Sequence, residues 1–134
     1  MKLSERVAII TGGGSGIGRA TCRLFAEAGA TVIVADKNLD TAESVVAEIA
    51  DEGGKAIALA VDVSSEEQVK AMIAKAESDY GRLDILVNNA GYGFAGTVVT
   101  TSQEDWDALM AVNVNGVFFG CKHAIPLMER NGGG

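Results

Sequence analysis

A glycine-rich segment near the start of the chain carries its strongest chemical signal. The segment Thr11-Gly12-Gly13-Gly14-Ser15-Gly16-Ile17-Gly18 follows an apolar run and precedes a stretch of helical periodicity. Glycines allow a tight turn and a close approach of backbone to ligand, and the first N–H groups of a helix bind phosphate. Glycine-rich turns are common, but this strand–turn–helix context favours a pyrophosphate site, here with T-G-x-x-x-G-x-G spacing.

Asp36 ends the second apolar run, twenty residues after Gly16. A carboxylate in this place accepts a hydrogen bond from the 2′-hydroxyl of an adenosine ribose and repels a 2′-phosphate. The alternative interpretation is a solvated Asp at a strand end. No Lys or Arg interrupts the glycine segment, although Lys37 follows Asp36 directly. The residues therefore predict NAD in preference to NADP.

Polar residues also follow the third and fourth apolar runs, as Asp62-Val63 and as Asn88-Asn89-Ala90-Gly91. The carboxyl ends of parallel strands form the ligand crevice of an open α/β sheet, so three strand ends are expected at one site. Asp62 could meet an adenine amino group. Asn88 and Asn89 could tie loop backbones together and face the cofactor, although an ordinary Asx-rich turn would look the same.

Four short runs, at 7–10, 31–35, 56–61 and 85–87, are almost wholly apolar and alternate with helical segments. Such runs are typical of strands covered on both faces. The pattern predicts an α/β fold, a doubly wound parallel sheet with strand order 3-2-1-4. This is one domain over residues 1–134, incomplete because the chain stops before a fifth strand.

The helical segments show apolar stripes typical of faces that pack on a core. The first stripe comprises Ile17, Ala20, Thr21, Leu24, Phe25 and Ala28. A third helix is expected to begin at Ser65, with Gln68 completing a capping box. A fourth is expected from about Ser102 into Val117, Phe118, Cys121 and Ile125, with a kink at Pro126. Phe119 and Leu127 lie off the main apolar stripe of this helix, so they are expected to pack against a partner. Trp106, Leu109 and Met110 are expected to lie in the core.

Composition narrows the possible partners and location. A net charge of −7 argues against duplex nucleic acid and anionic membrane, and no apolar run is long enough to span a bilayer. Cys22 and Cys121 lack CxxC spacing and are expected to be buried free thiols in a reduced cytoplasm. His123 has no second ligand near it in sequence, so no metal site is expected.

Taken together, these residues resemble the short-chain dehydrogenase/reductase family. The glycine segment, Asp62-Val63, Asn88 to Gly91 and Asn113 follow the family's order and spacing over essentially the whole chain. The resemblance implies hydride transfer between a nicotinamide cofactor and an alcohol or ketone, in a homo-oligomer. It implies that Asn113 is the Asn of the catalytic tetrad, ordering a water in the proton relay. The implied cofactor contacts are Gly12, Ser15, Gly16, Ile17, Gly18, Asp36, Asp62, Val63, Asn89, Ala90 and Gly91.

The chain departs from the family in one respect. The family's acid/base residue is the Tyr of a Tyr-x-x-x-Lys motif, with a Ser upstream, but here Tyr80 has Asp84 four residues later and Tyr92 has Gly96. We therefore expect a cofactor-binding portion that is inactive alone. The alternatives are a non-catalytic NAD-binding module and an assembly fragment whose fourth strand pairs with another chain. A methyltransferase is disfavoured, because Thr11 stands where those enzymes usually carry an acidic residue.

Overall fold

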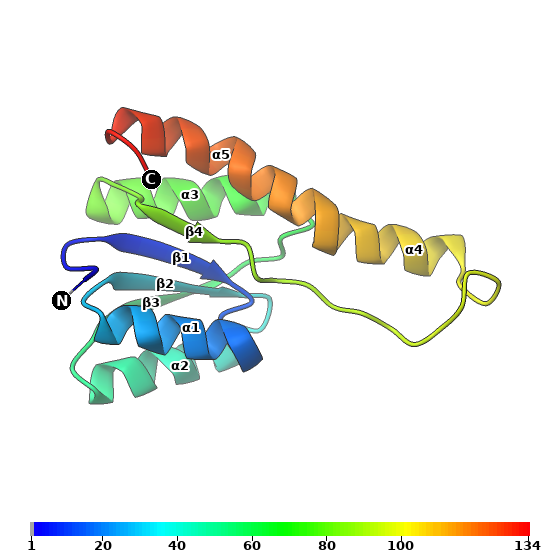
Figure 1. Ribbon diagram of the computed structural model, residues 1–134, viewed down its shortest axis with the longest axis horizontal. Coiled ribbons are helices and arrows are strands. Elements are labelled where there is room, and N and C mark those ends of the chain that lie inside the picture. Colours follow the sequence, from blue (N-terminus) through cyan, green and yellow to red (C-terminus); the bar gives the residue numbers. More distant parts are fainter. Residues whose placement is uncertain (1) are drawn as a thin grey trace.

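The computed structural model describes residues 2–134 and contains a parallel four-stranded sheet with helices on both faces (Figure 1). The sheet order β3-β2-β1-β4 confirms the predicted 3-2-1-4. The elements are β1 (Val7–Thr11), α1 (Gly16–Glu27), β2 (Thr31–Asp36), α2 (Leu39–Asp51), β3 (Lys55–Ala60), α3 (Glu66–Tyr80), β4 (Ile85–Val87), α4 (Gln103–Met110), the π-helix η1 (Ala111–Asn115) and α5 (Gly116–Arg130).

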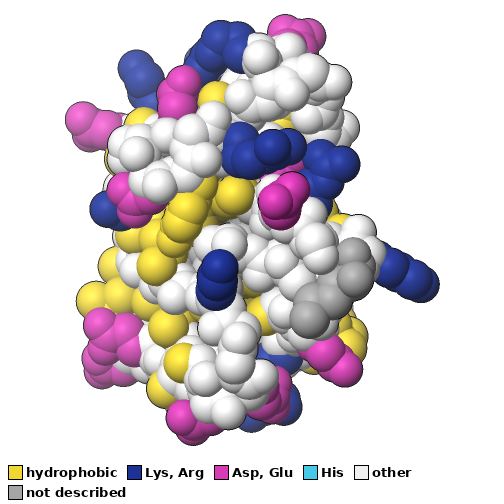
Figure 2. Space-filling model, turned by 90° about the vertical axis from the view of Figure 1, so that its left-hand side faces the viewer, with side chains coloured by type: hydrophobic (Ala, Val, Ile, Leu, Met, Phe, Trp, Pro, Cys, Tyr) yellow, Lys and Arg dark blue, Asp and Glu magenta, His cyan; other side chains and the backbone are white. Residues whose placement is uncertain are grey.

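Two hydrophobic layers hold the helices to the sheet. Successive residues of β1 point to opposite faces, so Ala8 and Ile10 pack with α1 and α2, while Ile9 packs with α3 and α5. The two central strands are almost completely buried, whereas β3 and β4 are only partly buried because they form the sheet edges. Figure 2 shows the end of the molecule at which the strands begin, where positive and negative side chains are interspersed.

Polar side chains cap the amino ends of three helices. Asn38 caps α2, and Ser102 caps α4. At α3 the Ser65 side chain accepts a hydrogen bond from the Gln68 N–H, as a capping box requires. In a full capping box the Gln68 side chain would accept from the Ser65 N–H. Here it accepts instead from the N–H of Asp62, at 2.9 Å.

The apolar stripe predicted for α1 is wrong in part, since Phe25 alone of its large side chains packs against the core. Ile17 is 80% exposed and Leu24 is 62% exposed, and the buried residues are Gly18, Cys22 and Ala26. The reason is close packing, since a Cβ on Gly18 would lie 2.0 Å from the carbonyl oxygen of Gly12. Only the small face of the helix can approach the strand ends this closely, so Ile17 and Leu24 point away from the sheet.

Helix α5 repeats this arrangement and corrects a second prediction. Its buried residues are Gly116, Gly120, Ala124 and Leu127, whereas Val117, Phe118 and Ile125 are exposed. A Cβ on Gly116 would lie 2.8 Å from Val63 Cγ2. Leu127 therefore needs no partner, because it lies in the core with Phe119 packed against that core.

Two smaller predictions also change. Cys22 is buried, and burial raises its pKa to about 12, but Cys121 is exposed. Trp106 is 54% exposed, and Leu109 and Met110 are only partly buried, because α4 extends beyond the sheet and has no core beneath it (Figure 1). Helix α5 continues through Pro126 to Arg130, and the kink expected at Pro126 stays a prediction.

Strand β4 is short, and a buried carboxylate holds its amino end to β1. Asp84, 5% exposed, accepts hydrogen bonds from the Val7 N–H at 2.9 Å, from Arg82 at 2.6 Å and from Arg6 at 2.8 Å. Burial alone would raise the pKa of Asp84, but the hydrogen bonds from Arg82, the Val7 N–H and Arg6 outweigh it and lower the pKa to about 2. The carboxylate is therefore ionised throughout the physiological range.

A buried hydroxyl holds the carboxyl end of β4. Thr11, 3% exposed, donates from Oγ1 to the Val87 carbonyl at 3.3 Å and accepts from the N–H groups of Asn89 and Ala90, each at 3.0 Å. The Asn89 side chain adds two more hydrogen bonds between the same segments, by donating to the carbonyls of Thr11 and Gly12. The loop that follows β4 is thereby tied to the loop that follows β1.

We predict that Asp84→Asn lowers the free energy of unfolding by about 2 kcal/mol at neutral pH, because a charged partner of buried hydrogen bonds is lost. The pKa of Asp84 is lower in the folded protein than in the unfolded chain. Its stabilisation is therefore full above about pH 4 and is lost as the pH falls towards 2. Urea unfolding over this range should show a weaker acid dependence in the variant. Asp79→Asn, in an exposed pair with Lys75, is the matched control and should cost about 0.5 kcal/mol or less.

Thr11→Val should lower the free energy of unfolding by about 1–3 kcal/mol, because two backbone N–H groups lose their acceptor. Thr11→Ser keeps the hydroxyl and should retain most of the stability. Chemical denaturation of the three proteins measures the difference. An unchanged stability of Thr11→Val, or a larger loss in Thr11→Ser than in Thr11→Val, would contradict the role of the hydroxyl.

Candidate functional site

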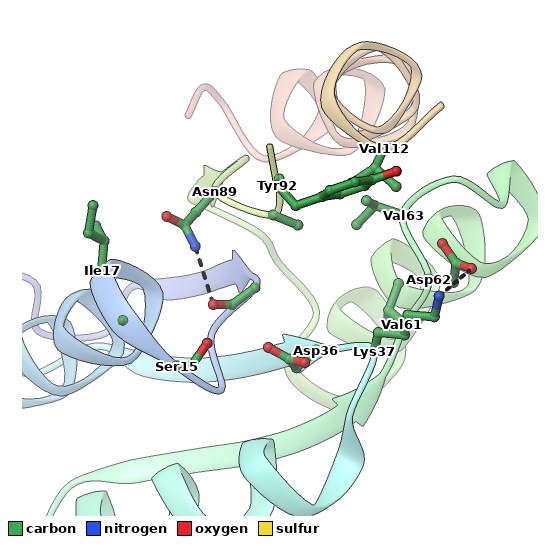
Figure 3. Close-up of a pocket in the computed structure, with 14 residues that line it drawn as sticks. Ser15, Ile17, Asp36, Lys37, Val61, Asp62, Val63, Asn89, Tyr92 and Val112 are labelled. Carbon is green, nitrogen blue, oxygen red and sulfur yellow. Dashed lines mark hydrogen bonds and ion pairs between the residues drawn. The ribbon is translucent and has the colours of Figure 1, made fainter. Parts of the chain in front are cut away.

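A cleft of about 490 Å³ opens where the four strands end (Figure 3). Its wall combines the glycine segment, the ends of β2 and β3, the loop after β4 and one residue of η1. The lining residues are Gly12, Ser15, Gly16, Ile17, Asp36, Lys37, Val61, Asp62, Val63, Asn89, Ala90, Gly91, Tyr92 and Val112. The topology therefore gathers residues that are up to one hundred positions apart in the sequence.

This wall contains every predicted cofactor contact except Gly18. Gly18 is buried behind the glycine segment, against the Gly12 carbonyl, so its place is structural support for the wall. Asn88, which was expected to face the cofactor, lies instead against α5, with Nδ2 at 3.7 Å from the sulfur of Cys121. Its neighbour Asn89 does line the cleft and ties the two loops together.

The glycine segment has the backbone shape that an anion site requires. Gly12 and Gly16 adopt φ of 63° and 54°, a region that favours glycine. Helix α1 begins at Gly16, so its first N–H groups and the positive end of its dipole lie at the cleft. An anionic group such as a pyrophosphate fits this end of the wall.

Asp36 is held between two backbone segments. Its Oδ2 accepts from the Gly14 N–H at 2.9 Å, and its Oδ1 accepts from the Asn38 N–H at 2.9 Å. The carboxylate therefore has one orientation at the cleft wall, with lone pairs left for further donors. Two adjoining hydroxyls of a ribose are donors of this kind.

Asp62 supplies a second carboxylate across the cleft. Its Oδ1 accepts from the Ser64 hydroxyl at 2.6 Å and from the Ser64 N–H at 3.0 Å. The hydroxyl is the main cause that lowers the pKa of Asp62. The other oxygen, Oδ2, lies 3.9 Å from the ammonium of Lys37, whose side chain is otherwise exposed (Figure 3).

Asn113 lies behind the wall and holds Tyr92 in it. The Asn113 side chain accepts from the Tyr92 N–H at 3.0 Å and donates to the Tyr92 carbonyl at 2.7 Å. It projects from η1, and π-helical turns of this kind are frequent at functional sites. Figure 3 shows the Tyr92 ring lying toward Val63 and Val112.

Sequence reasoning missed four residues of the wall, Lys37, Val61, Tyr92 and Val112. Each adjoins a predicted residue, so proximity in sequence was the available signal. No metal-binding group of three or more His, Cys, Asp or Glu occurs among residues 2–134. No helix in that range is both long and apolar enough to cross a membrane.

A family model described as short chain dehydrogenase matches residues 6–134. The chain is 42% identical over 134 residues to the 3-oxoacyl-[acyl-carrier-protein] reductase FabG of Thermotoga maritima, covering 98% of this chain and 54% of that protein. It is 38% identical to the 3beta-hydroxysteroid dehydrogenase of Mediterraneibacter gnavus, covering 98% of this chain and 48% of that protein. The chain thus spans about half the length of these curated relatives.

Solved structures agree with the sequence relatives. A hydroxysteroid dehydrogenase from Escherichia coli superposes with a TM-score of 0.95 at 42% identity, over 99% of this chain and 56% of that one. A metagenomic short-chain oxidoreductase in complex with NADP superposes with a TM-score of 0.96 at 35% identity, over 100% of this chain and 61% of that one. Motif order, sheet topology, cleft position and the match over residues 6–134 lead to one conclusion. The chain belongs to the short-chain dehydrogenase family.

Proposed function

We propose that this chain binds NAD in the cleft and serves an oxidoreductase that moves a hydride between nicotinamide and an alcohol or ketone. The observation that carries the proposal is the meeting of a helix N-terminus and a fixed carboxylate, Asp36, at one cleft. The start of α1 would hold the pyrophosphate, and Asp36 the adenosine ribose. The adenine would lie at Asp62 and Val63, leaving the nicotinamide toward Ile17 and the Asn89–Tyr92 loop.

The preference for NAD rests on charge. The Asp36 carboxylate would repel a ribose 2′-phosphate, and two N–H groups hold it in place. Lys37 is the nearby cation that could favour NADP, but its ammonium lies 3.9 Å from Asp62, which offsets its charge. The NADP-bound structural relative shows that a protein of this fold can take the other cofactor.

Asn113 is the proposed contribution of this chain to the proton relay. Its amide already makes two bonds to Tyr92, which leaves one N–H and one lone pair for a water. Bound nicotinamide would supply or accept the hydride. The chain contains no Tyr with Lys four residues later, so we propose that the chain alone does not turn over substrate.

A non-catalytic NAD-binding module and an assembly fragment are the competing functions. The second is favoured by β4, whose outer edge adjoins an apolar groove of about 310 Å³ lined in part by Ile85, Leu86, Ala124 and Met128. An unpaired strand with an apolar flank can accept a strand from another polypeptide.

We also propose a homo-oligomer built on the exposed apolar side chains of α4, η1 and α5. A reduced cytoplasmic location is proposed as well, in keeping with the two free cysteines.

Calorimetric titration tests the cofactor proposal. The chain should bind NAD more tightly than NADP, and Asp36→Asn should reduce that preference about tenfold because the repelling charge is lost. Asp51→Asn, at the far end of α2, is the matched control and should leave the preference unchanged. Equal affinities of the unaltered chain for the two cofactors would contradict the role of Asp36. An alcohol-oxidation assay on the same sample should show no turnover, and activity would show that the chain has its own acid/base group.

Sedimentation analysis tests the homo-oligomer. Phe118, 59% exposed on α5, should lie in the contact, so Phe118→Glu should shift the protein to monomer by placing a charge in an apolar interface. Leu39→Glu is the control, since Leu39 is an exposed apolar residue at the start of α2, on the other side of the sheet. A monomeric unaltered chain, or equal effects of the two substitutions, would contradict this interface.

A further inference from the structure

The short segment Asp62-Val63, between β3 and α3, is held on the α3 side by hydrogen bonds. The Asp62 N–H donates to the side-chain oxygen of Gln68, at 2.9 Å. The Asp62 carbonyl accepts from the Ser65 N–H at 3.1 Å, and Asp62 Oδ1 accepts from Ser64. Gln68 lies in the first turn of α3, outside the cleft wall.

These bonds determine where the remaining polar groups point. The two bonds to backbone atoms of Asp62 restrain the torsion angles on both sides of its α-carbon. A carbonyl and the following N–H point in opposite directions across a planar peptide. The Asp62 carbonyl is turned toward α3, so the Val63 N–H is turned away from it. In the described range 2–134 that N–H has no acceptor within the protein.

Asp62 and Val63 both line the cleft, so the Val63 N–H and Asp62 Oδ2 would present a donor beside an acceptor to a ligand there. The adenine edge offers the complementary pair, an exocyclic amino group that donates and a ring nitrogen that accepts. Hypoxanthine has the reverse polarity at both places, an oxygen that accepts and a ring N–H that donates. The orientation of the peptide between Asp62 and Val63, which sets the direction of the donor, would thus distinguish the two bases.

We propose that Gln68 is a positioning residue that sets this adenine-reading pair and so makes the cofactor site selective for adenine. The inference rests on the proposed NAD function and extends it to a residue that does not touch the cofactor. Without the Gln68 oxygen, the Asp62 N–H loses its acceptor, and only the bonds from Ser64 and Ser65 hold the segment on the α3 side. The Asp62 carboxylate and the Val63 N–H are then less firmly placed, and the preference between the two bases falls.

The test compares NAD with nicotinamide hypoxanthine dinucleotide by calorimetry. The unaltered chain should prefer NAD about tenfold, and Gln68→Met, similar in length but without the acceptor, should reduce the preference at least about threefold. Gln68→Glu keeps an acceptor oxygen and should retain the preference for NAD. Gln103→Met makes the same change in the first turn of α4 and should have no effect. Thermal unfolding of each variant reports on folding separately.

A second measurement needs no cofactor. Amide hydrogen exchange at Asp62 should be about tenfold faster in Gln68→Met than in the unaltered chain, Gln68→Glu or Gln103→Met. Unchanged exchange at Asp62, or an unchanged base preference in Gln68→Met with intact NAD binding, would overturn the role of Gln68 alone. Failure of the unaltered chain to bind either dinucleotide would overturn the proposed function and the adenine-reading role together.

Discussion

The attachment of β4 to β1 is the constraint on which the rest of the site depends. β4 has three residues, and the backbone pairing of so short a strand is weak by itself. A buried carboxylate at one end, Asp84, and a buried hydroxyl at the other, Thr11, add side-chain bonds to that pairing. The loop bearing Asn89, and beyond it Tyr92, follows β4 directly, so these two attachments set the position of that part of the cleft wall.

Close packing of the helices explains which apolar side chains remain at the surface. Where α1 and α5 approach the sheet most closely they do so through glycine, alanine and cysteine, because a larger side chain would overlap the backbone or Val63. Several of their larger side chains consequently point outward. Ile17 reaches the cleft, and Phe118 lies on the surface where a partner could cover it. One packing requirement thus prepares both a ligand surface and a candidate assembly surface.

The polar groups of the cleft are oriented before any ligand arrives. Asp36 is fixed by two N–H groups, Asp62 by Ser64 and Gln68, and Tyr92 by Asn113. A ligand that meets groups already oriented does not have to order them, which lowers the free-energy cost of binding. The groove beside β4 differs from the cleft in this respect, since most of the side chains that line it are apolar.

The sequence by itself determined the strand order, the place of the glycine segment and the residues that gather at the strand ends. Each follows from local periodicity and from the rules of parallel sheets. It could not determine which face of α1 or α5 is buried, because the spacing of apolar residues does not record how closely a helix must approach its sheet. Nor could it assign the amides of Asn88, Asn113 and Gln68 to Cys121, Tyr92 and Asp62. A short polar side chain bonds whatever lies within about 3 Å of it, and only the tertiary structure decides what that is.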